Sequence, residues 1–89
     1  MQDVTIYTTG FCPFCYHAKK LLDSKGVAYD EIDVGAVPGA RKEMMQRAQG
    51  SHTVPQIFIG DHHIGGCDEL YALDQQQKLD PLLAQDAAS

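Results

Sequence analysis

The sequence has no tryptophan, few aromatic residues (8%) and little positive charge. Its 7 Lys and Arg residues against 12 Asp and Glu residues give a formal net charge of −5 at pH 7, which argues against nucleic acid as a partner. No apolar stretch is long enough to span a bilayer, so we expect no membrane association. Residues 1–9 lack the cationic start and the apolar run of a secretory signal. These absences favour a protein of the cytoplasm.

Cysteine is scarce as well, and its number is odd. The three cysteines are Cys12, Cys15 and Cys67, so a framework in which every cysteine is paired is excluded. Structural disulfides are rare in the cytoplasm, where cysteines usually carry out chemistry or bind metal. The cysteines are therefore the first candidates for function.

The remaining composition fits one ordinary globular domain. The chain is 44% hydrophobic and 21% charged, which is usual for a folded protein. A length of 89 residues allows a single core but not a second. We therefore expect one domain over residues 1–89, with fraying only in the tail QDAAS at 85–89.

Apolar periodicity predicts an α/β fold. Alternating patterns indicate strands at 3–8, 27–34, 55–60 and 62–65. Helical spacing indicates helices at 13–25, from about 35–38 to 49, from about 66, and in a short final segment at 79–85. The order βαβαββα predicts a small four-stranded mixed sheet with helices on both faces, and the first crossover is expected to be right-handed.

Two of these helices carry more detailed expectations. The second helix should bury one apolar stripe made of Val37, Ala40, Met44 and Ala48. In the final short helix, Asp80 can cap the N-terminus and Pro81 suits the first helical position.

The segment TTGFCPFCYHAKKLL places Cys12 and Cys15 at the start of the first helix. Cys12 falls in the turn before the helix, because Pro13 is well tolerated at the first helical position. Cys15 lies almost one turn further on, beside Ala18 on the apolar stripe, and within disulfide reach of Cys12. We therefore expect an exposed thiolate at Cys12 and a sheltered thiol at Cys15.

This placement suits rapid disulfide exchange. A free cysteine with a pKa of ~8.5 is about 3% ionised at pH 7, and a helix N-terminus can lower the pKa to ~3.5–7.5. The gain in thiolate is largely offset in attack, because nucleophilicity falls with the pKa. The larger benefit is that a stabilised thiolate is a good leaving group, which speeds its release from mixed disulfides.

A metal site is the main alternative reading of C-x-x-C. Zinc sites often open with this spacing, and Cys67 with a histidine could complete a set of three cysteines and one histidine; the candidate histidines are His52, His62 and His63. However, the second close pair that is usual in zinc sites is missing. We also expect His62 and His63 in an exposed hairpin turn. The sequence therefore favours redox chemistry and no metal.

Three motifs carry a resemblance to a known family. CPFC after a strand, TVPQIFIG in the middle and GGCDEL before the last helices resemble a dithiol glutaredoxin of the short bacterial type. The resemblance runs from Val4 to Leu83. It implies the thioredoxin fold and a monomer that reduces protein disulfides and glutathione mixed disulfides with glutathione. Glutathione reductase and NADPH would regenerate the glutathione.

The resemblance also implies roles for individual residues. Cys12 matches the nucleophile and Cys15 the resolving thiol. Pro55 is cis in the family, and the backbone of Val54, extended before a proline, would pair with the cysteine of glutathione. At the third motif, Gly66 and the N–H groups of Cys67 and Asp68 would hold the γ-glutamyl carboxylate. The Asp68 carboxylate would pair with the α-amino group.

The sequence departs from the family pattern at several positions. Thr8, Thr9 and Gly10 stand where a lysine is common before the first cysteine, so less positive charge is available for the glycyl carboxylate. We assign that role to Lys42, with Thr9 and Thr53 as further contacts. Phe14 stands where tyrosine is common. Cys67 is shared by some relatives and is expected to be a secondary oxidation site rather than catalytic.

Two other redox functions stay open on the sequence alone. A thioredoxin-like reductant would use the same fold, but the chain has no tryptophan and its site is C-P-F-C rather than one with a Gly-Pro core. An iron–sulfur cluster carrier would use Cys12 with glutathione to bridge two subunits. Pro13 and the available Cys15 thiol argue against that use.

Overall fold

The computed structural model describes residues 3–84, so the expected fraying of QDAAS lies outside the described residues. The elements follow the predicted order with the short fourth helix. They are β1 (Val4–Thr8), α1 (Pro13–Ser24), β2 (Asp30–Asp33), α2 (Ala40–Arg47), β3 (Gln56–Ile59), β4 (His62–Gly65), α3 (Cys67–Gln75) and α4 (Leu79–Ala84). Within residues 3–84, no helix combines the length and the apolarity needed to cross a membrane.

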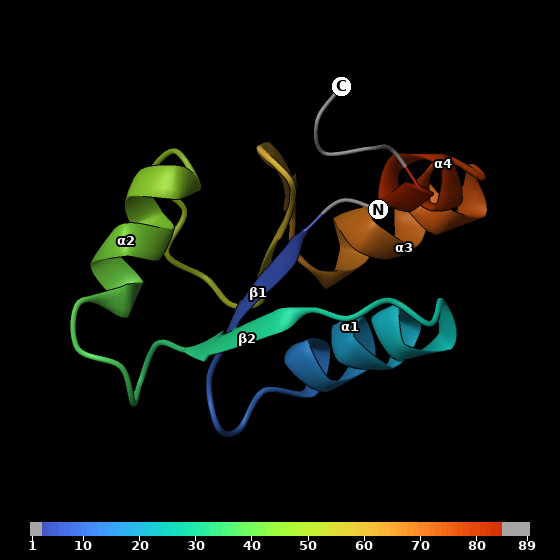
Figure 1. Cartoon of the computed structure of the whole chain (residues 1–89). Coiled ribbons are helices and arrows are strands. Elements are labelled where there is room, and N and C mark those ends of the chain that lie inside the picture. Colours follow the sequence, from blue (N-terminus) through green and yellow to red (C-terminus); the bar gives the residue numbers. More distant parts are fainter. Residues whose placement is uncertain (1–2, 85–89) are drawn as a thin grey trace.

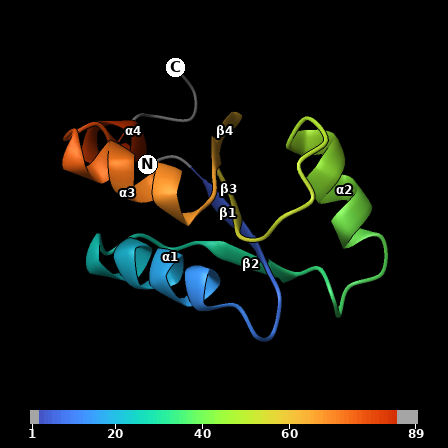
Figure 2. The same ribbon diagram turned by 180° about the vertical axis from the view of Figure 1, so that it is seen from behind.

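The strands form one mixed four-stranded sheet in the order β2-β1-β3-β4. β1 pairs parallel with β2 and antiparallel with β3, and β3 and β4 form an antiparallel hairpin. Helix α2 covers one face, whereas α1, α3 and α4 lie on the other (Figure 1; Figure 2 shows the reverse view). This is the predicted mixed sheet with helices on both faces.

The alternation of β1 builds two separate cores. Val4 and Ile6 point toward α1 and α3 and are at most 2% exposed. Tyr7 points the other way and packs with Met44 of α2 and Phe58 of β3. Because successive side chains of a strand face opposite sides, one central strand can serve both layers.

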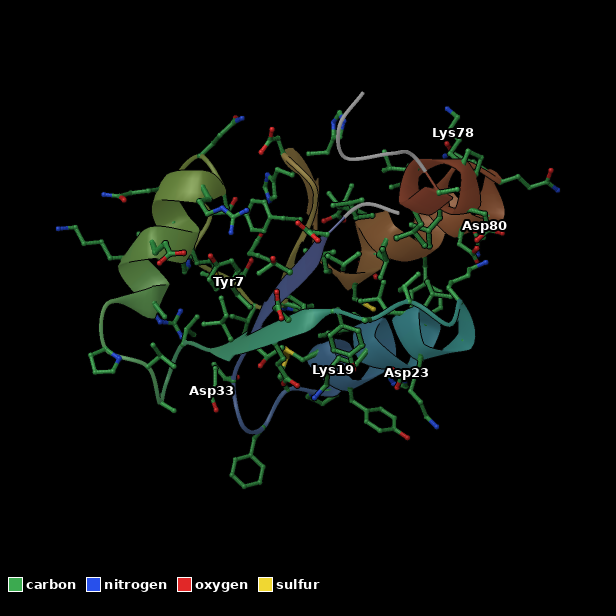
Figure 3. The ribbon with its side chains drawn as sticks, in the orientation of Figure 1. Tyr7, Lys19, Asp23, Asp33, Lys78 and Asp80 are labelled. Atoms are coloured by element: carbon green, nitrogen blue, oxygen red, sulfur yellow. A yellow bond between two sulfur atoms is a disulfide. The ribbon has the colours of Figure 1, made fainter. Side chains whose placement is uncertain are left out.

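Helix α1 begins and ends where the sequence predicts. Pro13 occupies its first turn, and after Lys25 the chain leaves the helix through Gly26, whose φ of +70° is costly for other residues. Lys25 then ties three helices together, because its Nζ lies 2.6 Å from Asp74 of α3 and 3.0 Å from Asp80 of α4. Figure 3 shows Asp80 on the side of α4 that faces the end of α1.

Three local predictions are wrong. The predicted strand at 27–34 is shorter than expected: β2 covers only Asp30–Asp33, where it pairs with β1. Val27 lies before the strand and packs into the core. Helix α2 starts at Ala40 after Gly39, whose φ is +80°, so Val37 stays in the loop and is 47% exposed.

The third wrong prediction concerns the cap of α4. This helix already starts at Leu79, so Asp80 does not cap it and instead uses its carboxylate for the ion pair with Lys25. The predicted first helical residue, Pro81, therefore occupies the third position.

Candidate active site

Cys12 is the N-cap of α1. Its backbone is extended, with φ −145° and ψ 99°, and its Sγ accepts a hydrogen bond of 3.1 Å from the N–H of Cys15. The first turn of α1 contains no acidic residue. An anionic sulfur at this position would thus face a backbone donor and the positive end of the helix dipole, without a nearby carboxylate on the same turn.

The second cysteine of the pair is shielded from solvent. Cys15 is only 2% exposed and lies on the buried face of α1, whereas Cys12 is half-buried at the surface. Their Cα atoms are 5.1 Å apart and their sulfurs form a disulfide. The pair can therefore store two electrons as thiols, and only one of the two sulfurs is presented to another molecule.

The loop before β3 lies directly beside Cys12. The peptide bond between Val54 and Pro55 is cis. The Val54 carbonyl oxygen lies 3.8 Å from Cys12 Sγ, although the two residues are 42 positions apart. Among residues 3–84, the backbone N–H and C=O of Val54 make no backbone hydrogen bond. No backbone partner within this range therefore competes with an extended peptide for these groups.

A cleft opens between this loop and the start of α3. Its volume is about 150 Å³, and it is lined by Phe14, Thr53, Val54, Pro55, Gly66, Cys67, Asp68 and Glu69. The loop and the helix approach so closely that a Cβ on Gly66 would lie 3.4 Å from the Pro55 carbonyl oxygen. The structure thus brings together every predicted glutathione contact except Thr9 and Lys42.

The two exceptions lie outside the cleft. Thr9 is half-buried in the turn after β1. Lys42 is exposed on α2. The basic side chain that touches the loop is its neighbour Arg41, whose Nη1 donates a 2.8 Å hydrogen bond to the His52 carbonyl oxygen. Sequence analysis missed Arg41, because no local pattern signals a contact between a helix and a loop further along the chain.

Glu69 is a second residue that the sequence analysis missed. Its Oε1 accepts a 2.8 Å hydrogen bond from the Gly66 N–H, so it caps the start of α3. The signal was present, because an acidic residue three positions after an N-cap is a common capping pattern. Glycine is required just before this cap: Gly65 has a φ of +111°, and a Cβ there would lie 2.7 Å from Glu69 Oε1. With Asp68, Glu69 makes this end of the cleft acidic.

Cys67 lies in different surroundings from Cys12. It is 8% exposed and belongs to the core with Leu70. Burial raises the pKa of the Cys67 thiol, and the carboxylates of Asp68 and Glu69 raise it further. A thiol that is both covered and protonated reacts slowly with oxidants. The structure therefore offers no support for Cys67 as an oxidation site.

The histidines lie differently from the prediction. The hairpin turn is made by Gly60 and Asp61, and the two histidines belong to β4. His62 is exposed, but His63 is half-buried and its ring stacks on Phe58 with centroids 4.9 Å apart. The prediction of an exposed turn is wrong for His63, because strand alternation turns it toward α2. Over residues 3–84, no group of three or more Cys, His, Asp and Glu side chains is placed to hold a metal ion.

Comparison with known proteins agrees with this geometry. The family model described as Glutaredoxin matches residues 4–64. Glutaredoxin 3 of Escherichia coli K12 is 54% identical over 83 residues, which cover 93% of this chain and 99% of the relative. The solution structure of a glutaredoxin from Brucella melitensis has a TM-score of 0.80 and 55% identity, covering 93% of this chain and 89% of its own.

A further solved structure includes the tripeptide itself. The buckwheat glutaredoxin–glutathione complex has a TM-score of 0.83 and 32% identity, covering 92% of this chain and 76% of the other. The fold is therefore the thioredoxin fold of these neighbours. The sequence identity, the family match and the paired cysteines at a helix start lead to one conclusion: this chain belongs to the glutaredoxin family.

Proposed function

We propose that the protein is a glutathione-dependent thiol–disulfide oxidoreductase in which Cys12 is the nucleophile and Cys15 the resolving thiol. The observation that carries the proposal is the position of Cys12, which caps α1 and accepts the N–H of Cys15 at 3.1 Å. A helix N-terminus with such a donor favours the thiolate over the thiol, and a stabilised thiolate leaves readily from a mixed disulfide. Both properties are needed for exchange in either direction.

With a glutathionylated protein, one cysteine is sufficient. The Cys12 thiolate attacks the glutathione sulfur, the protein sulfur leaves as a thiolate that takes up a proton, and glutathione stays on Cys12. A glutathione thiolate then attacks the glutathione sulfur of this adduct, which releases glutathione disulfide and restores the Cys12 thiolate. The net result is reduction of one mixed disulfide at the expense of one further glutathione.

With a protein disulfide, both cysteines take part. The Cys12 thiolate attacks one sulfur of the substrate disulfide and forms a mixed disulfide with it, while the substrate S–S bond breaks and the other substrate sulfur leaves as a thiolate that takes up a proton. Cys15, as its thiolate, attacks Cys12 Sγ and expels the second substrate thiol, so that the Cys12–Cys15 disulfide remains. Two glutathione molecules then reduce this disulfide in turn. The short separation of the two Cα atoms, 5.1 Å, permits the closing step.

The cleft is our proposed binding site for glutathione. The free N–H and C=O of Val54, beside Pro55, pair with its cysteine as a short added strand. Gly66 and the N–H groups of Cys67 and Asp68 hold the γ-glutamyl carboxylate, and the Asp68 carboxylate pairs with the α-amino group. Thr53 and Phe14 line the remaining walls.

Positive charge for the glycyl carboxylate comes from α2 in this proposal. Lys42 is exposed on α2, next to Arg41, which already touches the loop at His52. Thr9 adds a polar group on the side of Cys12. Charges at such an exposed site contribute about 0.2–1 kcal/mol each, so we expect this end of glutathione to be bound weakly.

The proposed reaction also needs a source of reduced glutathione and a suitable compartment. Glutathione must be held reduced by glutathione reductase and NADPH, and a compartment with that poise is the cytoplasm. The substrates are disulfide-bonded or glutathionylated proteins. We infer that the chain acts as a single domain and as a monomer.

The decisive experiment uses Cys15→Ser treated with glutathione disulfide. The variant should gain one glutathione on Cys12, measured by mass spectrometry of peptides, and should still reduce glutathionylated proteins. It should lose most of its reduction of protein disulfides, because the closing step is absent. An adduct mainly on Cys67 would contradict the assignment. Wild-type protein purified without oxygen should be colourless; a visible iron–sulfur spectrum would favour the carrier function instead.

A further inference from the structure

A chain of side-chain hydrogen bonds lies behind the proposed glutathione-binding loop. Gln56 is 4% exposed at the start of β3. Its Nε2 lies 3.0 Å from the Thr53 carbonyl oxygen and 3.3 Å from Thr53 Oγ1. Its Oε1 lies 2.6 Å from His63 Nε2. Every polar atom of this buried amide therefore has a partner.

The chain has only one consistent direction. The Thr53 carbonyl oxygen can only accept a hydrogen bond, so the amide that faces it must present its NH₂ group. The Gln56 oxygen then faces His63, and His63 Nε2 must carry a hydrogen and donate it. Donation thus runs from His63 to Gln56 and from Gln56 to Thr53.

His63 is itself fixed by the sheet. It is the cross-strand partner of Phe58 in the hairpin, and its ring is nearly parallel to the Phe58 ring, at 24°. The guanidinium of Arg47 from α2 lies 4.2 Å from the centroid of the same Phe58 ring. The donor end of the chain is therefore anchored to rigid elements rather than to loops.

The acceptor end controls a group that the proposed function requires. The Thr53 carbonyl and the Val54 N–H belong to one planar peptide unit and point in opposite directions. A hydrogen bond that fixes this carbonyl also fixes the direction of the Val54 N–H. Binding groups must be held within about 0.5 Å of their productive position. Thr53 and Val54 lie outside the strands, so pairing with a neighbouring strand does not fix them.

We propose that His63 is a positioning residue for glutathione binding: through Gln56 it orients the Thr53–Val54 peptide so that its N–H meets the cysteine of the bound tripeptide. This inference rests on the proposed function of the cleft. It gives a role in binding to His63 and Gln56, neither of which lines the cleft.

The test compares two substitutions at His63. His63→Phe keeps a ring that can stack on Phe58 but removes the donor; His63→Gln removes the ring but keeps an N–H at a similar reach. With a glutathionylated peptide as substrate, His63→Phe should raise KM about fivefold to tenfold, the effect of losing one buried hydrogen bond. The kcat should stay within about twofold, because Cys12 is untouched. His63→Gln should recover most of the affinity.

The neighbouring histidine provides the matched control. His62 lies on the same strand but is exposed, so His62→Phe and His62→Gln should leave KM unchanged. Thermal unfolding of every variant shows whether the fold is kept. If His63→Phe does not fold, Gln56→Met makes the same test, because it removes the amide that holds Thr53.

Several results would overturn the inference. They are an unchanged KM in folded His63→Phe, an equal rise in His62→Phe, a loss confined to kcat, or failure of His63→Gln to recover affinity. If the wild-type protein did not reduce the glutathionylated peptide at all, the proposed function would fail and the inference with it. An active wild type with an indifferent His63→Phe would overturn the inference alone.

Discussion

A cysteine stands at the start of two helices of this protein, and the two cysteines lie in opposite surroundings. Cys12 caps α1, is half-buried at the surface and has no carboxylate in the first turn of its helix. Cys67 is the first residue of α3, is 8% exposed and is followed at once by Asp68 and Glu69. Burial and these two carboxylates raise the pKa of the Cys67 thiol.

The comparison shows that a helix N-terminus does not by itself make a cysteine reactive. The dipole of α3 favours an anion at Cys67, but desolvation and two like charges oppose ionisation there and prevail. At Cys12 the dipole of α1 acts on a half-buried sulfur with no carboxylate on its turn. The start of α1 is thus suited to chemistry and the start of α3 to binding, through backbone N–H groups rather than through sulfur.

The largest effect should come from exchanging the two sulfurs for oxygen. Cys12→Ser should lose all measurable reduction of a glutathionylated peptide, because serine is not ionised near neutral pH. Cys67→Ser should keep kcat and KM within about twofold, since Cys67 contributes only its backbone to the proposed site. Steady-state kinetics of both variants provide the measurement. Comparable losses of activity in the two variants would contradict the different roles of Cys12 and Cys67.

A smaller effect is expected from the binding groups. Asp68→Ala combined with Lys42→Ala should raise KM for a glutathionylated peptide by about tenfold or more, mostly through Asp68, because a hydrogen bond to a charged group contributes about 1.5–3 kcal/mol and the exposed charge of Lys42 only about 0.2–1 kcal/mol. The rate at which iodoacetamide alkylates Cys12 should not change, since chemistry and binding lie on different helices. Unchanged KM would reject the proposed roles of both residues. The single variants then show which end of glutathione matters more.

The state of Cys67 can be altered without touching Cys12. In a Cys12→Ser, Cys15→Ser background, Glu69→Gln and Asp68→Asn should each lower the pKa of Cys67, because each removes a negative charge beside the thiol. The shift should be modest, since burial is the largest cause and remains. The pH dependence of Cys67 alkylation measures it. A pKa that stays where it was would mean that burial alone sets the state of this thiol.

The smallest effect concerns the ion pairs of Lys25, which join the end of α1 to α3 and α4. Asp74 and Asp80 raise the pKa of Lys25 above its ordinary value of 10.5. A raised folded pKa means that the contribution to stability is fully present below the unfolded pKa and is lost as the pH rises through the folded pKa. Lys25→Met should therefore lower Tm slightly at pH 7, and the gap to wild type should close in strongly alkaline solution. Calorimetry at several pH values tests this; an equal gap at every pH would indicate lost packing instead.

Much of the site could be predicted from local sequence. Pro13 and Gly26 bracket α1, and the C-x-x-C spacing places two sulfurs within one turn, whatever the rest of the chain does. The prediction for Val37 is wrong because it too rested on a local pattern. The spacing of Val37 fits the apolar stripe of α2, but the helix starts only after Gly39, so Val37 lies outside it. Local patterns give the type of an element more reliably than its ends.

What the sequence determined by itself is the chemistry at the start of α1, since dipole, cap and sulfur spacing depend only on neighbouring residues. The tertiary structure decided that Cys67 is covered, that the Val54 carbonyl lies beside Cys12, and that His63 faces Gln56 rather than water. These features join residues far apart in the chain. They depend on how the two layers pack against the sheet, because burial and contact are properties of the whole fold and not of any segment.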